Sequence, residues 1–325
     1  MHRYFVGCDL GGTNVRAALV DTVTGEISGI TMIPTMAREG YDAVMKRIAK
    51  LVKQVIQKSD LGSEQIGGVS VGMPGTVDMD QGVVQFLPNL PGQWRDVPLC
   101  SVVSGYLDLP VFLMNDVRAI TFGEWKFGAG KGVATMVCFA IGTGIGGGLV
   151  INHRLHLGIG GTAGELGHQT IDMNGPQCGC GNNGCVETYA SGPAIAAAGI
   201  KAVVQGATTR IGEMVDFDLN KINAGTIAQA ALEGDQVAQK IFDDAGTALG
   251  VAISNLVVSV SPERVVIGGG VLRAGDLLLE PIRRTIRQRV HVVPVDRVEI
   301  VPALLGDSAG IIGNAMWAKE KVAGK

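Results

Sequence analysis

The sequence predicts an α/β protein made of two related halves, and three observations support this. Apolar runs with the length of strands end in glycines, and between them lie stretches whose apolar residues recur at helical spacing. A strand, glycine turn and second strand near the start of the chain are repeated in its middle. With 46% hydrophobic and 18% charged residues among 325, the chain can bury a large core, which excludes a mainly disordered protein.

The elements alternate along the chain in the way typical of α/β proteins. Strands are predicted at residues 4–8, 15–20, 68–72, 111–114, 135–141, 147–151 and 264–267. Helices are predicted over residues 44–56, 117–127 and about 235–260, the last ended by Pro262. Residues 155–187 show no sustained period and are predicted to form a long loop, which is usually functional.

The repeat consists of residues 6–13 leading into 17–20, and of residues 138–144 leading into 147–150. Each half would form a strand, a glycine turn and a strand. We expect the two hairpins to face each other across a cleft, with the amides of both turns directed at a ligand.

Charge and composition narrow the class of protein. The 27 Lys and Arg against 30 Asp and Glu give a net charge of −3, so no general attraction to nucleic acid or an anionic membrane is expected. Asp9 interrupts any signal-peptide core, and no later stretch is expected to stay apolar for the ~20 residues of a membrane helix. We therefore expect a cytoplasmic protein.

The first glycine turn is a candidate phosphate-binding site. It comprises Asp9, Gly11, Gly12, Thr13 and Asn14, directly after an apolar strand. Glycines allow backbone amides to form a concave nest for phosphate oxygens, and Asp9 could hold Mg²⁺ through water. The alternative is a plain hairpin whose glycines supply positive φ angles. No Gly-Lys-Ser/Thr follows, so the turn is not a Walker motif.

A second glycine turn pairs with the first. Gly142, Thr143 and Gly144 begin a run denser in glycine than a hairpin turn requires, and the Thr143 hydroxyl can donate to a phosphate. Gly269 and Gly270 follow a predicted strand and would let a flat adenine approach the backbone, although a strand-to-helix turn explains them equally well.

Asn115 and Asp116 lie between a predicted strand and a predicted helix. Open α/β sheets bind ligands at the carboxyl ends of their strands, so Asp116 could accept a proton from a substrate there. Asp116 could also cap the helix that begins at Val117, and both roles can coexist.

Four potential metal ligands occur in the long loop, namely His168, Cys178, Cys180 and Cys185. Three thiolates and one imidazole make a complete tetrahedral Zn²⁺ shell of the structural type. The alternative, clustered reduced cysteines without a ligand, would be an oxidation liability. Glu165 and Glu187 flank the ligands and would be fixed by the same ion, although either could be a solvated surface acid.

Taken together, these residues resemble the ROK family of sugar kinases and repressors, over nearly the whole chain. The most specific part is Gly-Glu-Leu-Gly-His at residues 164–168, followed by the cysteine loop at 178–187. Gly-Met-Pro-Gly at residues 72–75 and Pro-Asn-Leu-Pro-Gly at residues 88–92 are also similar to family motifs, with Gln93 inserted before Trp94.

The resemblance implies an actin-like ATPase-domain fold, with ribonuclease H-like duplicated α/β lobes around a cleft. The small lobe would comprise residues 1–117 plus 308–325 and carry the first phosphate turn. The large lobe would comprise residues 118–307 and carry the second turn and the zinc loop. A helix after residues 306–310 would cross back to the first lobe.

The resemblance also implies a hexose kinase that uses ATP and Mg²⁺. Asp116 would be the general base for the sugar 6-hydroxyl, and the other hydroxyls would be bound by Asn115, Glu165, His168 and Glu187. Glucose is the expected substrate, but kinases of N-acetylglucosamine, N-acetylmannosamine, allose and fructose share much of the pattern. The expected partners are a hexose and ATP, without nucleic acid or membrane, in a homodimer or homotetramer.

Two non-catalytic alternatives within the family are disfavoured. A DNA-binding repressor needs a helix-turn-helix module ahead of the phosphate turn, and only eight residues precede Asp9 here. A sugar-sensing protein without catalysis would not be expected to keep Asp9, Asp116 and both glycine turns intact.

Overall fold

The computed structural model describes residues 2–87, 90–92 and 94–324, and these form two compact units. The first unit comprises Met1–Gly132, Arg154–Ala163 and Leu304–Lys325, and the second comprises Val133–His153 and Gly164–Ala303. The predicted lobe boundaries, at residues 117/118 and 307/308, therefore differ from the divisions after Gly132 and Ala303. The difference arises because the helix that begins at Asp116 packs on the helix that begins at Ala309, within the first unit.

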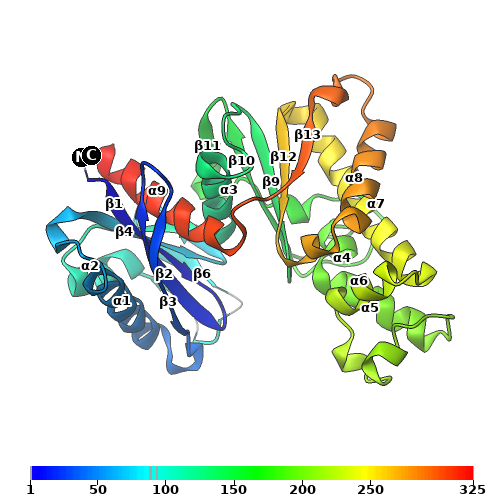
Figure 1. The fold of residues 1–325 in the computed structure, drawn as a ribbon, viewed down its shortest axis with the longest axis horizontal. Coiled ribbons are helices and arrows are strands. Elements are labelled where there is room, and N and C mark those ends of the chain that lie inside the picture. Colours follow the sequence, from blue (N-terminus) through cyan, green and yellow to red (C-terminus); the bar gives the residue numbers. More distant parts are fainter. Residues whose placement is uncertain (1, 88–89, 93, 325) are drawn as a thin grey trace. The chain divides into compact units, whose positions relative to one another are not determined.

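The first unit is built on a five-stranded sheet with the order β3-β2-β1-β4-β8 (Figure 1). Its strands are β1 (Tyr4–Leu10), β2 (Asn14–Asp21), β3 (Ile27–Pro34), β4 (Ile66–Met73) and β8 (Val111–Asn115). A small sheet contains β5 (Thr76–Asp78), β6 (Val83–Phe86) and β7 (Arg95–Val97). The helices are α1 (Tyr41–Gln57), α2 (Leu99–Leu107), α3 (Asp116–Phe127) and α9 (Ala309–Ala323). β1 is antiparallel to β2 and parallel to β4, which in turn is parallel to β8.

The second unit repeats this arrangement, which confirms the duplication predicted from the sequence. Its strands are β9 (Met136–Ile141), β10 (Ile145–Ile151), β12 (Arg264–Gly268) and β13 (Glu299–Pro302), and β11 (Arg154–His156) follows β10 along the chain. β9 is antiparallel to β10 and parallel to β12, which is parallel to β13. The helices are α4 (Glu187–Ala190), α5 (Gly192–Val204), α6 (Ala224–Leu232), α7 (Gln236–Val260) and α8 (Asp276–Arg289).

The helix at the end of the chain completes the first unit. α9 lies beside β1 and β4 of the sheet and packs along α3 (Figure 1). Asn314, fully buried, accepts a hydrogen bond from the Ser70 hydroxyl of β4 at 3.1 Å, and Trp317 Nε1 donates to the Leu113 carbonyl of β8 at 3.2 Å. These polar contacts fix the register of α9 on the sheet, while its alanine and isoleucine side chains fill the core.

α7 differs from the sequence expectation about membrane helices. It has 25 residues and is long and apolar enough to span a membrane by length and composition, but 56% of its most apolar stretch is buried inside the structure. Its buried face includes Phe242, Leu249 and Ile253, which belong to the core of the second unit. A core helix passes the same test as a membrane span, so α7 is weak support for a membrane location.

Residues 155–187 are largely irregular, as predicted. Apart from the end of β11 they contain two short 3-10 helices, at Ile159–Gly161 and Leu166–His168, and isolated bridges such as Thr170 with Cys185. Of the motif at residues 88–92, Pro88 and Asn89 lie outside the described residues, as does Gln93, whereas Leu90 and Trp94 are buried.

Candidate functional site

The predicted site residues fall into two sets, one in each compact unit. The first unit contains Asp9, Gly11, Gly12, Thr13, Asn14, Asn115 and Asp116. The second contains Gly142, Thr143, Gly144, Glu165, His168, Cys178, Cys180, Cys185, Glu187, Gly269 and Gly270. Each set is described within its own unit.

The first glycine turn joins β1 to β2, and its glycines are not explained by positive φ angles. Neither Gly11 nor Gly12 has a positive φ, and a Cβ atom added at Gly12 would meet no atom within 4 Å. The alternative of a hairpin that needs positive φ angles is therefore wrong for this pair. The missing side chain of Gly12 leaves open space beside the turn, as approach of an anion requires, whereas a Cβ atom at Gly11 would lie 3.2 Å from the Asn14 carbonyl oxygen.

Two polar residues hold the first turn and its neighbouring carboxylate in place. The buried Thr35 donates its amide to the Thr13 carbonyl at 2.8 Å and its hydroxyl to the Gly11 carbonyl at 2.7 Å. Asp9 Oδ2 accepts a hydrogen bond from Nη2 of Arg16 at 2.6 Å, and Asp9 and Arg16 are opposite each other on β1 and β2. The Asp9 carboxylate is thus oriented by a cation and remains partly exposed.

The second glycine turn joins β9 to β10 and is tied to α4. Gly142 has no positive φ, and a Cβ atom there would meet no atom within 4 Å. Glu187, the first residue of α4, accepts the Ile145 amide on Oε2 at 2.8 Å. A Cβ atom at Gly144 would lie 2.6 Å from that oxygen, so glycine is required for Glu187 to reach the turn. Thr143 is exposed at the tip.

A pocket of about 620 Å³ opens beside the second turn, and all of its lining residues belong to the second unit. Gly142, Thr143 and Gly270 form one part of its wall. The remaining lining is mostly apolar and includes Pro193, Ala196, Ala228, Leu232 and Val271, with Asn223, Gln229 and Arg273 as polar groups. This volume and this mixture of lining residues are typical of small-molecule sites of about 300–1,000 Å³.

The two explanations for Gly269 and Gly270, a strand-to-helix turn and backbone contact with a ligand, apply to different residues. Gly269 has a φ of 91°, and a Cβ atom there would lie 2.3 Å from the Ile141 carbonyl oxygen, so the strand-to-helix turn explains it. Gly270 lines the pocket. Of these two glycines, only Gly270 therefore offers its backbone to a ligand in this pocket.

Asn115 ends β8 and Asp116 begins α3, as the sequence predicts. Asn115, rather than Asp116, is the helix cap, because its Oδ1 accepts the amides of Val117 at 3.0 Å and Arg118 at 3.3 Å. The Asn115 Nδ2 donates to the Gly75 carbonyl at 3.2 Å, which joins the motif at residues 72–75 to this position. Asp116 Oδ1 accepts the Val117 amide at 2.8 Å, so its half-buried carboxylate lies at the helix N-terminus, where the dipole favours negative charge.

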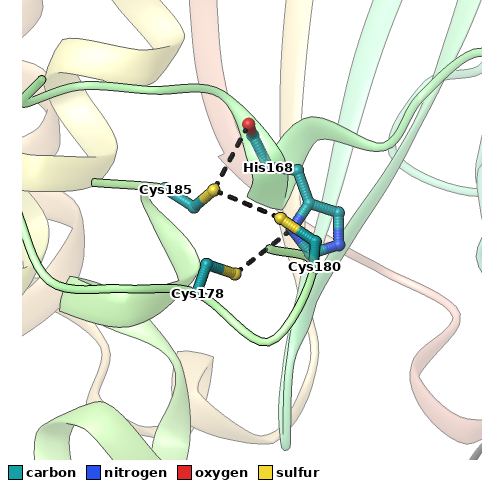
Figure 2. Close-up of side chains that lie close together, drawn as sticks. All are labelled: His168, Cys178, Cys180 and Cys185. Atoms are coloured by element: carbon teal, nitrogen blue, oxygen red, sulfur yellow. Dashed lines mark hydrogen bonds between the residues drawn. The ribbon is translucent and has the colours of Figure 1, made fainter. Parts of the chain in front are cut away.

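The four potential metal ligands converge in the irregular loop (Figure 2). Their donor atoms all lie within 4.8 Å of one another. Cys178 Sγ is 3.6 Å from His168 Nδ1, and Cys180 Sγ is 3.7 Å from Cys185 Sγ. Because the Nδ1 atom faces the cysteines, the Nε2 atom of the same ring is directed away from them (Figure 2).

These distances fit one tetrahedral metal ion. With metal–sulfur bonds of about 2.3 Å, tetrahedral geometry places two sulfurs about 3.8 Å apart. Sulfurs in a disulfide would lie about 2.05 Å apart, and all of these cysteines are free. The soft sulfur and imidazole donors select Zn²⁺ over hard ions such as Mg²⁺. The residues present therefore fit a structural zinc site.

Glu187 connects the metal cluster to the second glycine turn. Its Oε2 binds the Ile145 amide, as described above, and its Oε1 lies 3.9 Å from Cys178 Sγ. Glu165 is exposed and directly precedes the 3-10 turn that carries His168, whose amide donates to the Glu165 carbonyl at 3.1 Å. The loop thus presents an imidazole and two carboxylates from one short region of the second unit.

Several residues that shape the site are not identified by sequence motifs. Thr35 and Arg16 hold the first turn and Asp9, and Arg118 donates from Nη1 to the Asn115 Oδ1 at 2.9 Å. Arg118 is only 2% exposed, which no helical pattern would indicate for an arginine. The pocket walls come from separate helices, and no short motif marks them.

Comparison with known proteins places this chain in a family. The family model described as "ROK family" matches residues 5–321. Glucokinase from Halalkalibacterium halodurans is 35% identical over 98% of this chain and 96% of its own length. The xylose repressor from Caldicellulosiruptor bescii is 32% identical over 95% of this chain and 76% of its own length.

Solved structures agree with the sequence comparison. A ROK family glucokinase from Streptomyces griseus, in complex with glucose and AMPPNP, superimposes with a TM-score of 0.81 at 32% identity, covering 98% of this chain and 99% of the other. The expected actin-like ATPase fold is thereby confirmed. This chain belongs to the ROK family.

Proposed function

We propose that this protein is a glucokinase, which transfers the γ-phosphoryl group of ATP to the 6-hydroxyl of glucose. The observation that carries the proposal is the pocket of the second unit, which opens at the second glycine turn. A nucleotide with its base among the apolar walls would have its phosphates beside the second glycine turn, where Gly142 and Thr143 line the pocket. Glucose and AMPPNP are bound together in the S. griseus relative.

Asp116 is the proposed general base. The sugar oxygen attacks the γ-phosphorus, the bond from this phosphorus to the bridging oxygen breaks, and ADP leaves with the electron pair. The hydroxyl proton passes to the Asp116 carboxylate. The helix cap supplied by Asn115 holds Asp116 at the start of α3, so the base is fixed before the substrate binds.

The remaining site residues have supporting roles in the proposal. Asn115, Glu165, His168 and Glu187 bind the other sugar hydroxyls, and His168 can use Nε2 for this because Nδ1 faces the cysteines. The first turn contributes amides from Gly12 to Asn14, since the Gly11 amide donates to the Asn14 carbonyl at 2.9 Å, and Thr143 contributes a hydroxyl. Asp9 would hold Mg²⁺, a hard ion suited to its partly exposed carboxylate oxygens, and this ion supplies charge neutralisation during phosphoryl transfer.

Zn²⁺ is the proposed ion at His168, Cys178, Cys180 and Cys185. A structural ion here would order the loop that carries the sugar-binding groups, and orientation by such a support is a common way to position ligands. The cysteines must be reduced to bind the metal, which agrees with a cytoplasmic location. A homodimer or homotetramer is part of the same proposal and is tested by light scattering.

The test is a coupled assay of ADP release with Mg-ATP and a panel of glucose, mannose, fructose, allose, N-acetylglucosamine and N-acetylmannosamine. A preference for glucose in kcat/KM supports the proposal. A preference for another sugar replaces the substrate but keeps the kinase. Turnover of no sugar overturns the kinase, and a sugar-dependent DNA-binding assay then tests the repressor function of the xylose repressor relatives.

A further inference from the structure

The chain passes between its two compact units at four points, after Gly132, His153, Ala163 and Ala303. A kinase whose reacting groups lie on different units must control how the units move at such points. Two buried charged side chains of α3 contact the chain next to three of the four points. Neither side chain belongs to the proposed catalytic machinery.

Glu124 is the first of these side chains. It is fully buried, and all the partners that the described chain gives its carboxylate are backbone amides. It accepts the amide of Ala129 at 2.8 Å, just before the first crossing. It also accepts the amides of Leu304 at 3.1 Å and Leu305 at 2.8 Å, directly after the last crossing. One carboxylate therefore joins an outgoing and a returning segment that are far apart in sequence.

Arg118 is the second. It lies six residues earlier on α3, and it donates from Nε to the Ala163 carbonyl and from Nη2 to the Thr162 carbonyl, both at 3.0 Å. These are the last two residues before the third crossing, which leads to Glu165. A third bond from Nη1, to Asn115 at 2.9 Å, links the same guanidinium to the helix cap beside Asp116.

α3 is itself held firmly. A Cβ atom at Gly123 would lie 2.2 Å from the Ala309 carbonyl oxygen, and one at Gly313 would lie 1.8 Å from the Ala119 carbonyl oxygen. The backbones of α3 and α9 are therefore in direct contact, and α9 is bonded to the sheet. A helix packed this closely cannot shift without breaking the core of the first unit.

Glycines follow two of the anchored segments. Gly132 has a φ of 89° and lies three residues after Ala129, and Gly164 has a φ of 101° and directly follows Ala163. Rotation is possible beyond the first anchor at Gly132, where a Cβ atom would meet no atom within 4 Å, whereas a Cβ atom at Gly164 would lie 2.7 Å from the Gly147 carbonyl oxygen.

We propose that Glu124 and Arg118 are positioning residues that tie the crossing segments to α3, the helix that begins with Asp116. Any motion between the units is then confined to the few residues beyond the anchors. This inference depends on the proposed kinase function.

The test compares Glu124→Gln with Asp235→Asn. Glutamine keeps the size of Glu124 but presents an NH₂ group to backbone N–H donors. Asp235 is a matched control, because it is a buried carboxylate that accepts the amides of Ala238 at 2.9 Å and Arg210 at 2.6 Å, and both contacts lie within the second unit. Loss of general stability would affect both variants.

Three quantities are measured at a temperature where both variants are folded. The nucleotide Kd without sugar is expected to stay within about twofold in both variants, since the pocket lies in one unit. The kcat is expected to fall about tenfold or more only in Glu124→Gln, because misplacement by about 1 Å can cost ~10²-fold. The decrease in radius of gyration on adding glucose and ADP, from small-angle X-ray scattering, is expected to shrink only in Glu124→Gln.

A folded Glu124→Gln with a kcat and a compaction like the wild type overturns the inference. If that variant does not fold, Arg118→Lys tests the other anchor, because lysine cannot serve three acceptors in the same fork, and the same two readouts decide. A wild type that phosphorylates no sugar refutes the proposed function instead. In that case the decrease in radius of gyration of the wild type, compared with that of the variants, still tests the anchoring role of Glu124 and Arg118. If the wild type shows no such decrease, the inference is overturned.

Discussion

Replacement of Cys180 by serine separates metal binding from packing. Cys180 is the exposed member of the cluster, whereas Cys178 and Cys185 are buried. Without a metal, Cys180→Ser is a surface substitution and should change the free energy of unfolding by no more than about 0.5 kcal/mol. With a metal, the same change removes one of four ligands.

The size of the effect follows from binding to the folded state only. A ligand present at about 1,000 times its Kd stabilises the fold by about 4 kcal/mol. At about 2–4 °C per kcal/mol for a unit of this size, loss of zinc should lower the Tm of the second unit by about 8–16 °C. The KM for the sugar should rise in parallel, since the loop that carries His168 and Glu187 loses its support.

The assay is thermal unfolding of wild type and Cys180→Ser, with and without a chelator, together with the zinc content per chain. The wild type should bind one zinc and lose stability with chelator, and the variant should do neither. Cys100→Ser is the control, because Cys100 is a free cysteine outside the cluster, and its chelator response should match that of the wild type. A Tm of Cys180→Ser within about 2 °C of the wild type, or no chelator effect on the wild type, would refute the metal site.

Three further predictions concern the base, the glycine turns and alkaline pH. Asp116→Asn should lower kcat by about 10²–10⁴-fold in the ADP-release assay with an unchanged Tm, and near-normal turnover would remove the base role. Gly12→Ala should leave the stability against urea unchanged but weaken the use of Mg-ATP in the ADP-release assay. Gly269→Ala should destabilise the fold by about 1–2 kcal/mol or more, since its Cβ atom would meet Ile141. Equal urea midpoints of the two variants would contradict this. Burial raises the pKa of the Cys100 thiol to about 12. As the pH rises, the unfolded chain therefore loses this proton before the folded chain does. The stability that the buried thiol contributes is present below about pH 8.5 and is lost as the pH rises toward 12. Cys100→Ala should therefore show a shallower fall in urea midpoint between about pH 8 and 10, and parallel curves would refute the assignment.

Local patterns were sufficient to predict the main elements. Continuous apolar runs of strand length identify the strands predicted at residues 4–8 and 135–141, because both strands are buried almost throughout. The repeated glycine turns identify the duplicated hairpins because each turn lies between two apolar runs. The helices of the pocket wall, such as α5, were not predicted, since glycine and alanine at most positions of Gly192–Val204 give no apolar face to detect.

The metal cluster and Asp116 could be found from sequence because each depends on residues close together along the chain. Thr35, Arg118 and Glu124 could not. Each has at least one partner 24 to 181 positions away, and a buried arginine or glutamate looks like a surface residue until the segments it contacts are known. The lobe boundary differed for a related reason, as the helix 116–127 could belong to either half until its packing partner was visible.

The place of α9 in the first unit determines the order in which the protein can be made. β1 and β4 leave the ribosome early, but the helix that covers them begins only at Ala309. At a synthesis rate of about 5–20 residues per second, the sheet of the first unit lacks α9 for about 10–50 s. During this time the whole second unit is synthesised and can fold. An apolar sheet face is exposed throughout this interval. We expect newly made chains to depend on chaperones during it, and chains that stop before α9 to aggregate although nearly all of the site residues are present.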